Sequence, residues 1–212
     1  MPRTHQCRLG LLLAALLVSA SCDDPARPGK KQDKAIDPNL LCSCRPTHIT
    51  KDDWRIEFKN GSLPQGPPQE ATIAAILQWR QGPEPGARTL RSGPELTLYH
   101  VREAYLQSVF LRESDCDLHM EISELADKIA PRMIIETPGT SEYCEARSGM
   151  FAALRRKGIT LSDLNQELSP PLPVEITGVP FRDQAHPVWF ARGSKKVVTL
   201  WELHPAIAKI SP

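Results

Sequence analysis

The 212-residue chain lacks an excess of charge of either sign. Its 26 Lys and Arg residues face 25 Asp and Glu residues, which gives a formal net charge of +1. Proteins that bind DNA or RNA draw most of their non-specific affinity from a strongly basic surface. The balanced charge therefore argues against nucleic acid as a partner.

The chain also lacks the motifs of two large groups of enzymes. It contains no G-x-S-x-G motif, which surrounds the nucleophile of many hydrolases, and no glycine-rich phosphate-binding loop. The sequence therefore favours a protein without enzymatic activity over an enzyme.

No apolar run in the chain is long enough to cross a membrane as a helix. Residues 9–18 are apolar apart from one Gly, but a spanning helix needs about 20 such residues. Basic residues precede this run and three small residues, 19–21, follow it. This order is typical of a secretory signal, so we expect residues 1–21 to be a signal peptide.

Cys22 follows the small residues directly. The arrangement resembles the processing site of bacterial lipoproteins, where the Cys becomes the acylated first residue, although Ser19 stands where those proteins prefer Leu. The alternative is ordinary cleavage near Ala20 with Cys22 left as a thiol. Lipidation would anchor the protein outside the cytoplasm on the cell membrane, facing the periplasm in a Gram-negative cell.

Three further segments can be separated by composition. Residues 22–45 are polar and Pro-rich and predict a disordered tether. Residues 46–92 form a small N-terminal appendage, in which residues 55–58 suggest a short strand and residues 69–79 carry the apolar stripe of a helix. Residues 93–212 are rich in β-forming side chains and make up the main domain.

The main domain alternates between strand and helix signals. Residues 95–111 predict one long bent strand or two short ones, and residues 160–163 resemble the capping box of a short helix that prolines 170, 171 and 173 would end. The other expected elements are strands at residues 117–123, 132–137, 174–181 and 197–204, and a helix at residues 141–157.

Three strands, a helix and two more strands, with a long first strand, are typical of the OB-fold. We therefore predict a mainly β (α+β) protein: a five-stranded OB-fold-like barrel with a helix between strands 3 and 4, plus the N-terminal appendage. An α+β sandwich is the alternative.

Period-two alternation assigns side chains to the two faces of the expected strands. Leu118, Met120 and Ile122 should face the core, and Cys116 lies on their side. His119 lies on the opposite face with Asp117 and Glu121. In the last strand Trp201 and Leu203 alternate with Glu202 and His204. We therefore expect the polar side chains of both strands to lie outside the barrel.

Three carboxylate–imidazole pairs follow from this pattern. They are Asp117 with His119, Asp183 with His186, and Glu202 with His204. Imidazole nitrogens and carboxylate oxygens are ligands for a divalent metal such as zinc, so the set is also compatible with a metal-dependent hydrolase. The simpler interpretation is that these groups hydrogen-bond to each other at the ends of strands.

Four cysteines follow Cys22, and an even number in an oxidising compartment favours disulfides. Cys42 and Cys44 are too close in sequence for an easy mutual bridge and are badly spaced for zinc. We expect Cys116 to bond Cys144. The alternative is that each of these two pairs with a cysteine of the N-terminal segment.

The motifs D-x-H at residue 117, I-x-E-x-P at residue 134 and E-L-H-P at residue 202, with T-G-x-x-F-x-D between the last two, resemble those of a family of small secreted bacterial domains. The resemblance implies the barrel and the positions of the polar residues, but no reaction.

The sequence as a whole predicts a membrane-tethered binding module outside the cytoplasm. Its partner would be a small ligand or an envelope protein, held on the outer face of the barrel. A metal-dependent hydrolase and a structural envelope lipoprotein are the alternatives.

Overall fold

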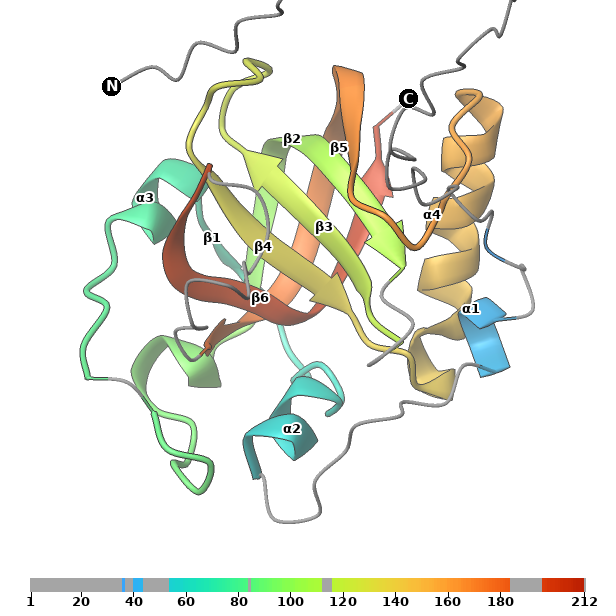
Figure 1. Cartoon of the computed structure of the whole chain (residues 1–212). Helices are drawn as coiled ribbons and strands as arrows, with labels where there is room; N and C mark the ends of the chain where they lie inside the picture. Colours follow the sequence, from blue (N-terminus) through green and yellow to red (C-terminus); the bar gives the residue numbers. More distant parts are fainter. Residues whose placement is uncertain are drawn as a thin grey trace, which may run out of the picture. The chain divides into compact units, whose positions relative to one another are not determined.

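Five strands close on one another to form a barrel (Figure 1). The computed structural model describes residues 36, 40–43, 54–83, 85–111, 116–183 and 196–211. In chain order, the barrel strands are β2 Tyr99–Leu111, β3 Leu118–Ser123, β4 Arg132–Thr137, β5 Gln166–Arg182 and β6 Val197–Ile210.

The pairing of these strands is that of an OB-fold. They follow the order β2–β3–β4–β6–β5, and β5 pairs back with β2 to close the barrel. β4 and β6 run parallel, whereas the other barrel pairs are antiparallel. Helix α4, Cys144–Arg156, connects β4 to β5. The predicted five-stranded barrel with a helix between strands 3 and 4 is therefore confirmed.

β2 is a single bent strand that pairs with two neighbouring strands. It pairs with β5 from Tyr99 to Val109 and with β3 from Tyr105 to Leu111. The register shifts in both pairings between Leu106 and Ser108. Such irregularities bend a strand and increase its twist, which lets one long strand belong to both sides of a small barrel.

The structure overturns the short helix that was expected to begin at the capping box of residues 160–163. This segment contains only a bridge and bends, and β5 already begins at Gln166 and runs through Pro170, Pro171 and Pro173. The prolines are tolerated because β5 pairs with β6 only from Val174 onward, so its first half is an edge on that side.

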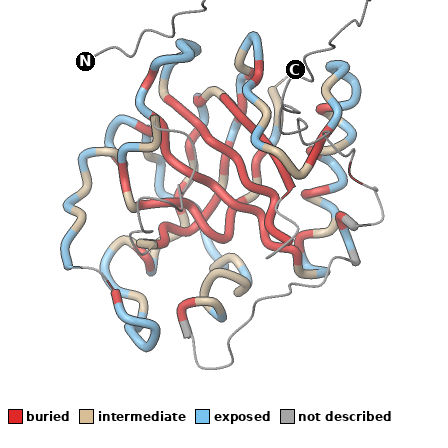
Figure 2. The backbone as a smooth tube through the Cα atoms, viewed as in Figure 1, coloured by how far each residue is buried: buried red, intermediate tan, exposed pale blue. Residues whose placement is uncertain are grey.

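The core fills the barrel with side chains from alternate strand positions. Leu118, Met120 and Ile122 of β3 lie in it, and Met150 and Leu154 of α4 pack against them from the helix. Figure 2 shows the barrel strands as the buried part of the molecule. Each large apolar side chain buried in this way contributes about 1.5–3 kcal/mol.

The N-terminal part of the described chain packs against this barrel. Residues 55–58 belong to helix α2, Trp54–Lys59, so the expected strand there is wrong. Helix α3, Ile73–Leu77, is shorter than expected because Gln69–Glu70 form strand β1, which pairs with β2. The Thr72 side chain caps α3 by accepting a hydrogen bond from the Ala75 amide.

The disulfide differs from the expected one. Cys144 bonds Cys42, with 4.8 Å between their Cα atoms, and not Cys116. Cys42 lies in a short helix, α1, Leu40–Ser43, which packs against α4 within the segment expected to be a tether. Cys116 faces Gly139 of the chain that leads to α4, and it belongs to a separate disulfide. The period-two alternation of apolar residues predicted only that Cys116 lies on the core side of the strand. It gave no information about which cysteine bonds Cys144.

No helix within the described ranges is long and apolar enough to cross a membrane. The expected signal peptide and Cys22 lie outside those ranges.

Candidate functional site

Three neighbouring strands carry polar side chains on the face turned away from the core. His119 of β3 is paired with Glu136 of β4, and Glu202 of β6 is paired with Ile134 of β4. Their strand neighbours Met120, Ile135 and Leu203 all lie in the core. Because side chains alternate along a strand, the polar groups gather on the outer face of the barrel.

Glu136 lies at the centre of this group. One of its carboxylate oxygens, Oε1, lies 2.5 Å from Nδ1 of His119, and the other, Oε2, lies 2.9 Å from Nδ1 of His204. An aromatic ring packs against each imidazole: Phe110 against His119, with 4.5 Å between ring centroids, and Phe181 against His204, with 6.3 Å. The two histidines are therefore held on opposite oxygens of one carboxylate.

His204 is in contact with two more acidic side chains. Its Nδ1 lies 3.4 Å from Oε1 of Glu202, and its Nε2 lies 3.5 Å from Oδ2 of Asp117. The side chain is completely buried, yet neither ring nitrogen is aligned for a hydrogen bond. The contacts of Nδ1 with Glu136 and Glu202 are thus short in distance but electrostatic in character.

Lys59, the last residue of α2, brings a positive charge to the same group. Its Nζ lies 3.0 Å from Oε1 of Glu202, 3.7 Å from Oδ1 of Asp183 and 3.9 Å from Oε2 of Glu136. Burial alone would lower the pKa of Lys59, but the carboxylates of Glu202 and Asp183 outweigh that effect and raise it. The ammonium group therefore keeps its charge next to these acids.

Six side chains together form the Glu136 cluster: Asp117, His119, Glu136, Glu202, His204 and Lys59.

Charges within the cluster shift the ionisation of its members. Burial opposes a charge on His204, but the nearby carboxylates of Asp117 and Glu136 outweigh it and raise the pKa of His204 to about 10. Burial would also raise the pKa of Glu136, but its contacts with His119 and His204 hold that pKa well below the usual range. Glu136 is therefore an anion between two imidazoles.

The structure brings together most of the predicted site residues. Asp117, His119, Glu202 and His204 all belong to the cluster, and Asp183 touches it through Lys59. His186 lies outside the described residues.

Two expectations about these residues need correction. His119 pairs with Glu136 and not with its strand neighbour Asp117, because side chains two apart on a strand are farther apart than directly opposed ones. The side chains of His119 and His204 are also buried, being 2% and 0% exposed, although an outer face was expected to be open to solvent.

Sequence reasoning missed Glu136 and Lys59. Glu136 stands in an apolar strand, at an alternate position that the same period-two argument assigns to the outer face, so its signal was present. Lys59 had none, because α2 approaches β6 only through the tertiary fold.

A second polar group on the outer face is a structural ion pair. Glu121, which the sequence placed beside His119, lies 3.0 Å from Nη1 of Arg132, and both side chains are fully buried. Arg132 also binds Glu167 at 2.7 Å and donates to the Lys128 carbonyl. These bonds use much of the hydrogen-bonding capacity of the guanidinium, so we assign the group to stability.

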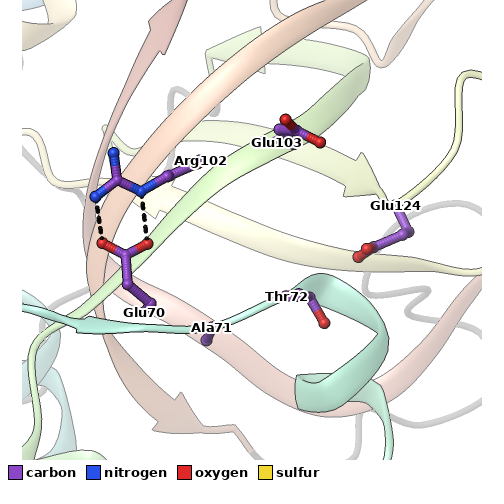
Figure 3. A pocket seen from close by; sticks show the side chains of 6 residues that line it. All are labelled: Glu70, Ala71, Thr72, Arg102, Glu103 and Glu124. Carbon is purple, nitrogen blue, oxygen red and sulfur yellow. Dashed lines mark hydrogen bonds and ion pairs between the residues drawn. The ribbon is translucent and has the colours of Figure 1, made fainter.

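A cleft of about 310 Å³ lies elsewhere, between β1, β2 and the start of α3 (Figure 3). Its lining residues are Glu70, Ala71, Thr72, Arg102, Glu103 and Glu124. Glu70 and Arg102 neutralise each other there through bonds of 2.8 and 3.0 Å. None of its residues belongs to the Glu136 cluster, so the cleft is not an entrance to it.

No family model, no curated protein and no solved structure matches the chain. The resemblance suggested by the motifs thus gains no support, and what the site does must follow from its own geometry.

Proposed function

We propose that the protein is a membrane-tethered binding module outside the cytoplasm, and that it holds a small ligand at the Glu136 cluster. One observation carries this proposal: three strands of the barrel and the residue just before β3 bring two imidazoles and three carboxylates to one place, and helix α2 adds the ammonium of Lys59. The outer face of the sheet is also where OB-folds take their ligands.

The burial of the cluster favours a small ligand. The side chains of Glu136, Asp117 and Glu202 are 9%, 8% and 2% exposed. A hydrolase must admit a substrate and a water molecule to its catalytic groups, whereas these groups are enclosed. The same enclosure is compatible with an ion or another ligand of a few atoms.

Two buried nitrogens without a partner support binding over a purely structural role. Nε2 of His119 and Nε2 of His204 have no hydrogen-bond partner among the described residues. Leaving a buried polar group unpaired costs about 1–3 kcal/mol. A ligand that binds these two nitrogens would supply the missing partners, which explains why the fold tolerates them.

The disulfide supports a location outside the cytoplasm. The bond between Cys42 and Cys144 requires an oxidising compartment to persist in most organisms. This agrees with the signal-like residues 1–21 and with lipidation at Cys22.

Native mass spectrometry tests the binding proposal. The protein is exported with its own leader, purified without an affinity tag and weighed under native and denaturing conditions. We expect a non-covalent mass increment that is present in the wild type and reduced or lost in His119→Gln. His100→Gln is the matched control, because His100 also lies between two carboxylates but outside the cluster. Identical native and denatured masses for all three proteins would refute the proposal.

Cell fractionation tests the anchor. Cys22→Ala should move the protein from the membrane fraction to the soluble fraction, because the acyl chains are attached through that sulfur. A wild-type protein that is already soluble and begins after Ala20 would show that no lipid is attached.

A further inference from the structure

The arrangement of three donors in the Glu136 cluster suggests the identity of its ligand. We propose that Asp117, Glu136 and His204 bind a divalent transition-metal ion, and that zinc fits best. This inference rests on the proposed function, since it names the ligand of the same site.

The distance between His204 and Asp117 is the first argument. Nε2 of His204 and Oδ2 of Asp117 are 3.5 Å apart, which is long for a hydrogen bond. Two ligands of one tetrahedral zinc ion, with bonds of about 2.0–2.2 Å, are separated by about 3.4 Å. The two atoms therefore already have the spacing that a shared zinc ion requires.

Glu136 supplies the third donor. One ligand atom from each of Asp117, Glu136 and His204 lies within 4.8 Å of the other two, and all three residues are buried. A separation of 4.8 Å is longer than the spacing between two ligands of one tetrahedral zinc ion. Rotation of a carboxylate about the bond that carries it moves its oxygens by more than the difference between these two distances. Buried carboxylates are costly unless they are paired or bind a metal.

The orientation and burial of the His204 ring support the same site. Nδ1 lies beside the carboxylates of Glu136 and Glu202, so the ring is fixed with Nε2 directed at Asp117. A metal-binding histidine usually donates its second ring N–H to a carboxylate. Here Nδ1 lies 2.9 Å from Glu136 and 3.4 Å from Glu202, without the alignment of a hydrogen bond. Nε2 itself has no hydrogen-bond partner, although the residue is completely buried.

The two carboxylate donors, Glu136 and Asp117, are each in contact with a further group of the protein. Nδ1 of His119 contacts Oε1 of Glu136, and the Gly139 amide donates to Oδ1 of Asp117 at 3.3 Å. One oxygen of each carboxylate is thus fixed by a group outside the proposed ligand set, and the second oxygen of each lies beside a ring nitrogen of His204. His119 is a positioning residue in this arrangement, because it acts through Glu136.

The mixture of donors selects the metal. Calcium and magnesium prefer ligand sets made entirely of oxygen, whereas zinc accepts imidazole nitrogen together with carboxylate oxygen. Lys59 lies on the Glu202 side of the cluster, 3.0 Å from Glu202 and 3.9 Å from Glu136. Its ammonium is therefore a competitor for Glu136 and not a ligand.

Metal content and zinc affinity of the full-length exported protein test this inference. Untagged protein is analysed by inductively coupled plasma mass spectrometry, then treated with EDTA and titrated with zinc against a chromophoric chelator. We expect about one zinc per chain, as a site with dedicated ligands implies. Calcium and magnesium should neither bind nor displace the zinc.

Variants distinguish a built site from adventitious binding. Asp117→Asn, Glu136→Gln and His204→Gln should each abolish stoichiometric zinc, while His119→Gln should weaken it about 10–100-fold, as the loss of an orienting partner does. Lys59→Met should bind zinc at least as tightly as the wild type, because it removes the competing cation. His100→Gln is the unchanged control, and circular dichroism checks that every variant is folded.

The possible outcomes separate this inference from the proposed function. Zinc that is retained by all three ligand variants is an adventitious ion only and overturns the inference. A metal-free wild type that carries an organic mass increment, lost in His119→Gln, refutes the metal and leaves the binding module. A wild type with neither metal nor increment refutes both. Loss of folding in Lys59→Met together with absence of zinc would identify the cluster as a structural ion network.

Discussion

Arg55 and Glu95 form an ion pair that is almost completely withdrawn from solvent. Their side chains are 6% and 5% exposed, and 2.5 Å separates Nη2 of Arg55 from Oε1 of Glu95. Arg55 also donates to the carbonyl of Arg182 at 2.7 Å, and Glu95 accepts from the amide of Arg182 at 3.0 Å. Because Arg55 and Lys59 lie on the same helix, this pair positions the lysine of the Glu136 cluster.

Removing one partner of this pair should be costly. Arg55→Ala is expected to lower the free energy of unfolding by about 3–5 kcal/mol, because it leaves the buried Glu95 carboxylate without the positive charge that pairs with it. Urea denaturation measures the change. Arg102→Ala is the matched control, since Arg102 forms a comparable pair with Glu70 at the surface, where solvent screens it. Equal losses for the two variants would contradict the argument.

At the scale of residues, the sequence located the histidines of the site and the carboxylate of Glu202 beside His204, but not Glu136 or Lys59. The alternation of "DLHMEIS" places His119 on the outer face, and the strand order brings His204 close to it. The pairing of His119 with Glu136 depends on the register between β3 and β4, which hydrophobic alternation fixes only to within two residues. Lys59 arrives from a helix that no local pattern connects to the barrel.

The connection from β4 to α4 passes very close to the start of β3. A methyl group on Gly139 would lie 2.5 Å from Cβ of Cys116 and 3.0 Å from its carbonyl oxygen. The Gly139 amide also donates to Asp117. The glycine therefore lets two elements approach each other at the edge of the Glu136 cluster.

Two glycine substitutions around α4 should have opposite effects. Gly139→Ala is expected to destabilise the protein by about 1–3 kcal/mol, because backbone atoms must move to admit the methyl group. Gly149→Ala within α4 meets no atom within 4 Å and should stabilise the helix by about 0.5–1 kcal/mol. Chemical denaturation of both variants checks the signs. If Gly139→Ala left the free energy of unfolding unchanged, the segment between β4 and α4 would be able to move aside at little cost, and the prediction would be wrong.

Elements with a clear hydrophobic period were predicted well, and elements set by tertiary contacts were not. The barrel strands and α4 follow from alternation and from a three-to-four-residue stripe. The period-two pattern of "RIEF" suggested a strand at residues 55–58, but α2 forms there, fixed by the buried pair of Arg55 with Glu95. The prolines of β5 suggested a break that an edge position makes unnecessary.

The disulfide between Cys42 and Cys144 closes a loop across much of the molecule. The two residues are 102 positions apart in sequence, and a loop of about 100 residues contributes about 4.7 kcal/mol in the chain-entropy model. The loop includes α2, α3 and the first three barrel strands. The bond therefore stabilises the barrel and the N-terminal helices as one unit.

Breaking this bond should weaken the whole fold. The double variant Cys42→Ala with Cys144→Ala is expected to unfold at a clearly lower guanidinium concentration than the wild type. Cys116 is also disulfide-bonded. With residues 1–21 removed and Cys22 acylated, as proposed above, Cys44 is the cysteine that remains for it, and we predict that bond. Non-reducing peptide mapping should recover both bonds. Recovery of free Cys44, or an unchanged denaturation midpoint in the double variant, would contradict these expectations.

The same bond has a mechanical consequence for an anchored protein. A force that enters the chain ahead of Cys42 reaches a branch point there, because Cys42 is covalently joined to α4 as well as to Ser43. The disulfide is the shorter route to the barrel, so it shields α2 and α3 from load. Lys59 and the ion pair behind it would keep their positions while the proposed tether is under tension, and reduction of both this bond and the predicted bond between Cys44 and Cys116 would transfer that tension to them.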